Sequence, residues 1–148
     1  MKTRDAIEQL KACESMYEAG RAATIHFLRT CQSDPSHIPS AAGFRMRDIL
    51  ACRNDLEHTY LIRMFTFFEA TLQTFWQRYS GKKSPQTVNW LMNRIAARRY
   101  MPSNHLHDAH GVRQFRNALA HNGNSRTLSL AEARSHLCKF LSNLPREW

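Results

Sequence analysis

Glycine and proline are scarce in this chain, with five of each among 148 residues. A β-sandwich or a barrel needs many tight turns, and those turns usually contain glycine or proline. Hydrophobic residues make up 43% of the chain and charged residues 22%, which is the balance of a folded globular protein. The long stretches without turn residues therefore predict helices, and the chain length predicts a single domain over residues 1–148.

The sequence also lacks a long uninterrupted hydrophobic run. Its most apolar stretch, residues 61–76, contains Arg63 and Glu69 and is too short and too polar for a membrane span. The N-terminal segment has no apolar core of the kind that secretory signals carry. Four cysteines (13, 31, 52 and 138) form no C-x-x-C pair, which predicts reduced thiols in helices and neither a disulfide framework nor a zinc site. We expect a cytoplasmic protein without membrane contact.

Acidic residues are few in comparison with basic ones. There are 12 Asp and Glu against 21 Lys and Arg, and the formal net charge is +9. Only five of the 21 are lysines, so 16 are arginines, which bind phosphate through a planar fork and stack on bases. This composition favours a nucleic-acid partner, RNA or DNA. The alternative is a solvated basic surface with no specific partner.

Apolar residues at intervals of three and four predict two long helices in the first half of the chain. The first covers about residues 4–29, and the Pro- and Ser-rich segment 33–43 is a loop. The second covers about residues 47–79 and ends at Ser80-Gly81. Its apolar residues predict the central core helix of a bundle. They are Leu56, Tyr60, Leu61, Met64, Phe65, Phe68, Leu72, Phe75, Trp76 and Tyr79.

Capping signals predict a third and a fourth helix. Ser84 is the expected N-cap of the third, with Pro85 at its first position, and Met101-Pro102 ends it. Val88, Leu91, Met92 and Ile95 are expected to face the core. Ser103 or Asn104 is the expected cap of the fourth helix, which runs to about Asn122 before Gly123.

A capping box at Ser129 and Glu132 predicts the start of a fifth helix. That helix is expected to bury Leu130, Ala133, Leu137, Phe140 and Leu141. Because the connections between the later helices are short, neighbouring helices should be antiparallel. The predicted fold is an all-α, up-and-down bundle of about five helices.

The end of the fourth helix carries the most informative motif. Arg116 and His121 are five residues apart, which is about 140° around a helix and about 7.5 Å along it. One helix therefore does not aim both side chains at one atom, whereas a two-fold partner would bring a second pair alongside. The spacing favours a composite site in a homodimer. Without further context, the two would be a surface cation and a histidine at a helix C-terminus.

Residues 116–121 (RNALAH) resemble the R-x4-6-H motif of HEPN domains, in the form with a polar residue after the arginine. The segment from Arg63 to Glu69 is similar to the aromatic-rich helix of many HEPN members. The resemblance implies an HEPN-like bundle and a metal-independent endoribonuclease without a cofactor, often a toxin or defence effector. It also implies a homodimer, with an antitoxin or other neutralising protein as a candidate partner. Other members keep the fold but only bind RNA or proteins, and that alternative stays open.

The chemistry expected from the motif is attack of a ribose 2′-OH on the adjacent phosphate, which gives a 2′,3′-cyclic phosphate. His121 would transfer protons near neutral pH, and Arg116 would stabilise the negative charge that develops on the phosphate. Asn117 would orient the phosphate or hold the histidine, and Glu69 would pair with Arg116 or fix the tautomer of His121. Some HEPN toxins have H-x-Y after the motif, but this chain has Gly123 in place of that tyrosine.

Further basic residues flank this motif. Arg94, Arg98 and Arg99 are expected to form an RNA-binding wall along one flank of the third helix, and Arg113 to serve the same purpose one turn before Arg116. A solvated helix face is the alternative. His105, His107 and His110 do not share one helix face and no fourth ligand is specified, so no metal site is predicted.

Overall fold

The computed structural model describes residues 2–38, 43–81, 86–120 and 128–148, and these form five α-helices without a β-strand. The helices are α1 (Thr3–Ser33), α2 (Met46–Ser80), α3 (Val88–Arg98), α4 (Ser103–Ala120) and α5 (Leu130–Leu141), with a 3-10 helix η1 (Pro35–His37) after α1. The prediction of an all-α bundle is confirmed. The expected bounds of the two long helices are also close to those observed.

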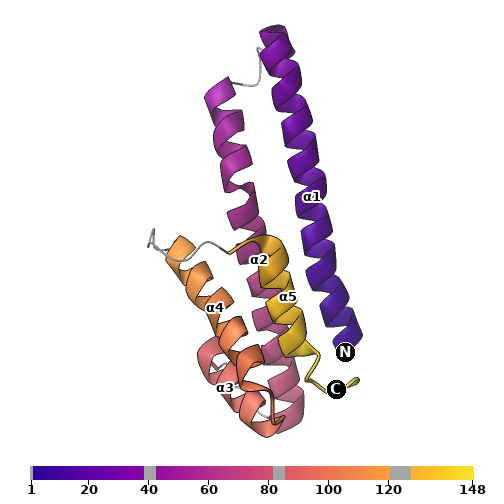
Figure 1. Ribbon diagram of the computed structural model, residues 1–148. Helices are drawn as coiled ribbons and strands as arrows, with labels where there is room; N and C mark the ends of the chain where they lie inside the picture. Colours follow the sequence, from indigo (N-terminus) through magenta and orange to yellow (C-terminus); the bar gives the residue numbers. More distant parts are fainter. Residues whose placement is uncertain (1, 39–42, 82–85, 121–127) are drawn as a thin grey trace.

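The two long helices form an antiparallel hairpin on which the rest of the chain is assembled (Figure 1). Helix α3 lies at the end of α2, α4 runs back beside α2, and α5 lies against α1, α2 and α4. The upper half of the hairpin projects beyond α4 and α5 (Figure 1). The two ends of the chain meet at its base, where the backbone N–H of Thr3 donates to the carbonyl of Arg146 at 3.0 Å.

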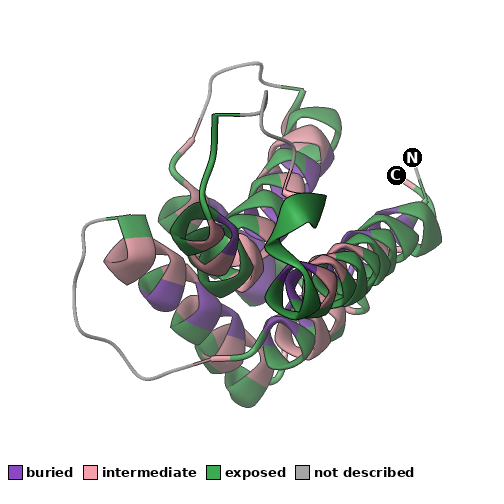
Figure 2. Cartoon of the chain, turned by 90° about the horizontal axis from the view of Figure 1, so that it is seen from above, coloured by how far each residue is buried: buried purple, intermediate pink, exposed green. Residues whose placement is uncertain are grey.

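The main core contains side chains from all five helices, and it lies on their inward faces (Figure 2). Its largest fully buried members come from α2 and α5, where the rings of Phe68 and Phe140 meet edge to face at a centroid distance of 5.3 Å. The residues predicted to be buried on α5 are all buried. On α2, Tyr79 is an error of the prediction because its side chain is 52% exposed. On α2, the apolar residues at helical spacing continue for one turn beyond the last residue that is buried in the core.

A smaller apolar cluster closes the projecting end of the hairpin. Leu28 and Cys31 of α1 pack there against Ile49 of α2. Partly buried side chains at residues 27, 38, 46 and 50 surround them. The hairpin is therefore closed by apolar contacts at both ends, and the segment between the two clusters is more polar.

Local hydrogen bonding explains where the helices begin and end. Gly81 ends α2 in the left-handed conformation (φ 69°), and the Ser129–Glu132 capping box opens α5, both as expected. The N-cap of α3 is Thr87, which accepts a hydrogen bond from Trp90 N, and the prediction of Ser84 and Pro85 is wrong. Residues 84 and 85 themselves lie outside the described residues.

The start of α4 also differs from the expectation. The carbonyl of Pro102 accepts hydrogen bonds from the N–H groups of His105 and Leu106, so the helix begins at Ser103. Ser103 and Asn104 therefore lie inside the first turn and do not cap it. Residues 121–127, which include the expected end of this helix at Asn122 and Gly123, lie outside the described residues.

All four cysteines are free thiols on helices, as predicted. Among the helices that the structure describes, none combines the length and the apolar character needed to cross a membrane.

Candidate functional site

Arg116 lies at the junction of α4 and α2. Phe115, the preceding residue, is buried in the core, and the helical rotation of about 100° per residue places Arg116 at the edge of the helix pair. Phe65 and Glu69 lie one turn apart on α2 and face it. The Arg116 guanidinium lies 4.8 Å from the centre of the Phe65 ring, and its Nη2 donates to Glu69 Oε2 at 3.4 Å. The expected pairing of Glu69 with Arg116 is present.

This arrangement holds the guanidinium in place without burying it fully. The side chain of Arg116 is 26% exposed and that of Glu69 is 37% exposed. A guanidinium has five N–H donors, and among the described residues only Glu69 accepts from it. Arg116 is therefore oriented by one aromatic face and one carboxylate and still reaches solvent. An oriented guanidinium of this kind can bind a phosphate.

The other two residues of the motif are less well defined. Asn117 is partly exposed, and its side chain makes no hydrogen bond within the part of the chain that the structure describes. His121 lies outside the described residues. The roles expected for both residues stay predictions.

A histidine that sequence reasoning missed lies beside this junction. The edge of the exposed His58 ring meets the Phe115 ring at a centroid distance of 6.5 Å. His58 precedes Phe65 by seven residues and Glu69 by eleven, so all three lie along one side of α2. The spacing of these three residues is visible in the sequence, but it indicates a site only when α4 is known to pack on this side of α2. The structure thus places an imidazole near the C-terminal half of α4.

Arg113 faces a different neighbour from Arg116. Its Nε donates to His110 Nδ1 at 3.4 Å, and His110 Nε2 lies 3.3 Å from Asn93 Oδ1 on α3. Burial lowers the pKa of His110, and the positive charge of Arg113 and the neighbouring His107 lower it further. His110 therefore joins α4 to α3, and Arg113 contacts this histidine from one turn away on α4.

The three arginines expected to share one wall are divided between two places. Arg94 and Arg98 line a groove between α2 and α3. Arg99 instead donates from Nε to the carbonyl of Asn143, beyond α5, at 3.0 Å. The prediction of a single wall is wrong for Arg99, because it is the C-cap of α3 and turns away from the face that carries the other two.

The histidines of α4 have separate environments. His105 contacts Asn143, His107 is exposed, and His110 contacts Asn93. The nearby Asp108 pairs with His136 of α5 at 3.2 Å. No group of three or more potential metal ligands occurs in the described part of the chain.

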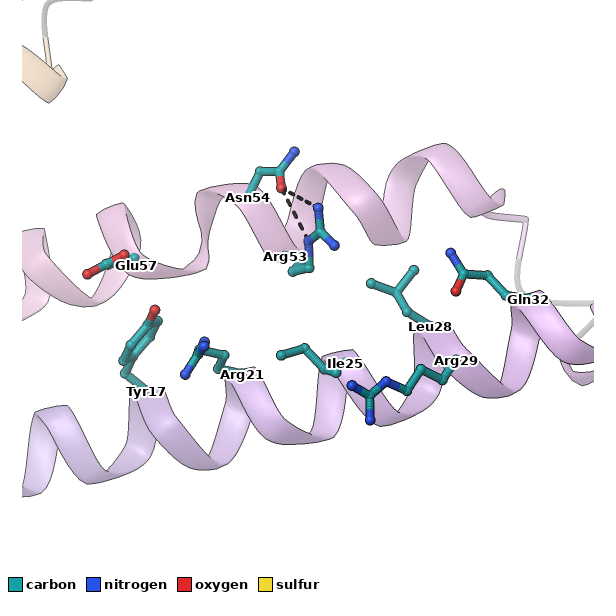
Figure 3. Close-up of a pocket in the computed structure, with 9 residues that line it drawn as sticks. All are labelled: Tyr17, Arg21, Ile25, Leu28, Arg29, Gln32, Arg53, Asn54 and Glu57. Carbon is teal, nitrogen blue, oxygen red and sulfur yellow. Dashed lines mark hydrogen bonds between the residues drawn. The ribbon is translucent and has the colours of Figure 1, made fainter. Parts of the chain in front are cut away.

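A second basic cleft lies between α1 and α2, in the polar segment of the hairpin (Figure 3). Its volume is about 470 Å³, and its walls carry Arg21, Arg29 and Arg53, which sequence reasoning did not single out. Arg21 pairs with Glu18 at 3.2 Å, and Arg53 turns toward Asn54 and donates to its Oδ1 (Figure 3). Because these guanidinium groups turn toward their own helices, they do not converge on one anion.

No family model, curated protein or solved structure matches this chain. Support for the HEPN resemblance therefore comes from the sequence motif, and support for a function of this site comes from its geometry.

Proposed function

We propose that this protein is a metal-independent endoribonuclease of the HEPN type. Arg116 and His121 act on the scissile phosphate, Glu69 positions Arg116, and Asn117 assists. The active form is a homodimer in which two copies of the motif border one groove, and the protein acts in the cytoplasm as a toxin or defence effector that a partner protein neutralises.

The observation that carries this proposal is the fixed guanidinium of Arg116. It stands over Phe65 and beside Glu69, at an edge that solvent reaches, five residues before a histidine. In metal-free RNA cleavage, a positioned cation stabilises the charge on the phosphorane-like transition state, and a group that titrates near neutral pH transfers the protons. Arg116 supplies the first of these, and His121 is the candidate for the second.

A catalytically silent RNA-binding or protein-interaction module is the second candidate. The ion pair between Arg116 and Glu69 favours this second candidate, because the Glu69 carboxylate neutralises part of the positive charge that a bound phosphate would contact. The two candidates differ in whether the RNA that contacts Arg116 is cut or only bound.

Cleavage of end-labelled RNA in the presence of EDTA tests the proposal. The wild type should cut, and its products should end in 2′,3′-cyclic phosphate. Arg116→Ala should lose at least about 100-fold in rate, by analogy with removal of one transition-state donor, and His121→Ala should lose a similar factor. Arg4→Ala, which removes one exposed arginine from α1, is the matched control and should cut at the wild-type rate.

Glu69→Gln separates positioning from electrostatics. If Glu69 only orients Arg116, the amide oxygen of the variant keeps the hydrogen bond and most of the activity, whereas Glu69→Ala loses more. A wild type that binds RNA without cutting it would establish the second candidate. Undiminished cleavage by Arg116→Ala would refute the proposed mechanism.

A further inference from the structure

An aromatic groove lies between the last turns of α2 and helix α3. Its volume is about 610 Å³, and Trp76, Tyr79, Trp90, Arg94 and Arg98 line it. No acidic residue lines the groove among the residues that the structure describes. From the sequence, Arg94 and Arg98 are expected to bind RNA and Trp76 and Tyr79 to lie in the core, whereas the structure brings these residues together with Trp90.

Two of the aromatic rings are exposed in this groove. Trp90 of α3 is 40% exposed and Tyr79 of α2 is 52% exposed, whereas Phe65, Phe68, Phe75 and Trp76 of α2 are buried. Each ring therefore leaves part of its apolar surface in water and forgoes part of the free energy that burial would supply. Exposed aromatic rings that gather in one groove are typical of a binding surface.

The exposed rings are also held rigidly. The buried Trp76 meets Trp90 edge to face at a centroid distance of 5.0 Å and packs against Tyr79 at 5.7 Å. Gln73 of α2 hydrogen-bonds through its side chain to the backbone of Gln86, just before α3, and so fixes the approach of the two helices. A rigid ring loses little entropy when a ligand stacks on it.

Arg94 and Arg98 line the same groove as these aromatic rings. The Arg98 guanidinium lies 5.7 Å from the centre of the Tyr79 ring, and its Nη1 donates to the Tyr79 hydroxyl at 3.1 Å. Arg94 lies one turn earlier on the same face of α3. Aromatic rings beside arginines form the usual platform for unpaired bases and their phosphates.

We propose that this groove binds single-stranded RNA, with an unpaired base stacked on Trp90 and the adjoining phosphates on Arg94 and Arg98. A duplex does not fit this chemistry because its bases are already stacked and paired. The choice of RNA rests on the proposed function. Tyr79 is ten residues from Glu69 on α2, which separates the two by about 15 Å along the helix and about 80° around it, so a strand that contacts both the groove and Arg116 has to pass around α2.

Fluorescence anisotropy with a labelled, fully 2′-O-methylated oligouridine tests this inference, because that probe cannot undergo 2′-OH attack. Trp90→Ala should weaken binding by between about fivefold and about 150-fold, which corresponds to about 1–3 kcal/mol for one stacked base. Trp90→Phe should keep most of the affinity. Arg94→Ala and Arg98→Ala should each lower the slope of log affinity against log salt by about 0.7. Arg47→Ala, which removes an exposed arginine at the start of α2, should change neither quantity.

The outcomes separate this inference from the proposed function. Wild-type affinity in Trp90→Ala, or equal affinity of the wild type for a duplex of the same length, would overturn the inference even if RNA is cut elsewhere. Loss of binding in Trp90→Ala without any RNA cleavage by the wild type would keep the groove and reject the nuclease. Unchanged circular dichroism and melting temperature show that the variants are folded.

Discussion

The four cysteine thiols differ in how far they are buried, although no pattern in the sequence distinguishes them. Cys13 and Cys31 are fully buried in α1, whereas Cys52 on α2 is exposed and Cys138 on α5 is half-buried. Burial raises the pKa of Cys13, with Arg63 opposing it, and burial likewise raises the pKa of Cys138. A raised pKa keeps a thiol protonated and unreactive at a pH where an ordinary thiol has begun to ionise.

Timed alkylation with iodoacetamide should therefore modify Cys52 at least about tenfold faster than the other three cysteines. The ratio of the Cys52 rate to the rates of Cys13 and Cys138 should shrink at high pH, because the thiolates of Cys13 and Cys138, whose pKa is raised by burial, form only there. Peptide mass spectrometry measures the four rates. In urea all four should react at similar rates, and equal labelling of Cys13 and Cys52 in the folded protein would contradict this account.

Among the helices, α5 receives a hydrogen-bond acceptor at its first turn from a carboxylate of α2. Glu57 Oε1 accepts a hydrogen bond from the backbone N–H of Leu130, in the first turn of α5, at 2.8 Å. The Tyr17 hydroxyl on α1 points toward the same carboxylate (Figure 3), and the pKa of Tyr17 is raised by burial and by the Glu57 charge. A negative charge at a helix N-terminus also interacts favourably with the helix dipole. Glu57 thus joins three helices.

Glu57→Ala should lower the free energy of unfolding by about 1–3 kcal/mol, because a partly buried N–H and the Tyr17 hydroxyl lose their acceptor. Glu57→Gln should lose less, since its amide oxygen can still accept. Chemical denaturation measures both.

Glu8→Ala is the matched control, because Glu8 forms an exposed ion pair with Lys11 at 2.9 Å. The free energy of unfolding of Glu8→Ala should fall by less than about 1 kcal/mol. Equal losses in the Glu57 and Glu8 alanine variants would show that the contact with α5 contributes nothing.

The whole molecule combines one large core with a projecting hairpin end. The core contains side chains from five helices, whereas the end of the hairpin depends on the small cluster of Leu28, Cys31 and Ile49. Local opening is easier where fewer apolar contacts have to break. The hairpin end should therefore open without unfolding of the bundle.

Hydrogen exchange measured by mass spectrometry should show this difference directly. Amides in residues 24–33 and 46–54 should exchange at least about tenfold faster than those in residues 61–76. Leu28→Ala should accelerate exchange at the hairpin end only, whereas Phe68→Ala should lower global stability by about 3–5 kcal/mol. Equal protection of the two regions in the wild type would contradict the division into two clusters.

Much of the fold could be predicted from local patterns in the sequence. The stripe from Leu61 to Trp76, the Gly81 stop and the Ser129–Glu132 capping box each involve residues within a few positions of one another. The failures also have local causes. Thr87 is itself a favourable N-cap residue and accepts the hydrogen bond from Trp90 N, and Tyr79 continues the apolar period after the core has ended.

The candidate site was predictable only in part. The pairing of Glu69 with Arg116 was expected, but the support from Phe65 and the position of His58 depend on how α4 rotates against α2. In the same way, Arg99 differs from Arg94 and Arg98 because α3 ends beside the C-terminal segment.

By itself, the sequence determined which segments are helical, which side of each helix is apolar and how basic the surface is, because a helix repeats every 3.6 residues and charge is a sum over residues. The tertiary structure decided which polar side chains meet. Arg116 with Glu69, Glu57 with Leu130, and Arg98 with Tyr79 join residues that are 19 to 73 positions apart. Such contacts depend on the angle and rotation at which helices pack, and no local spacing encodes those quantities.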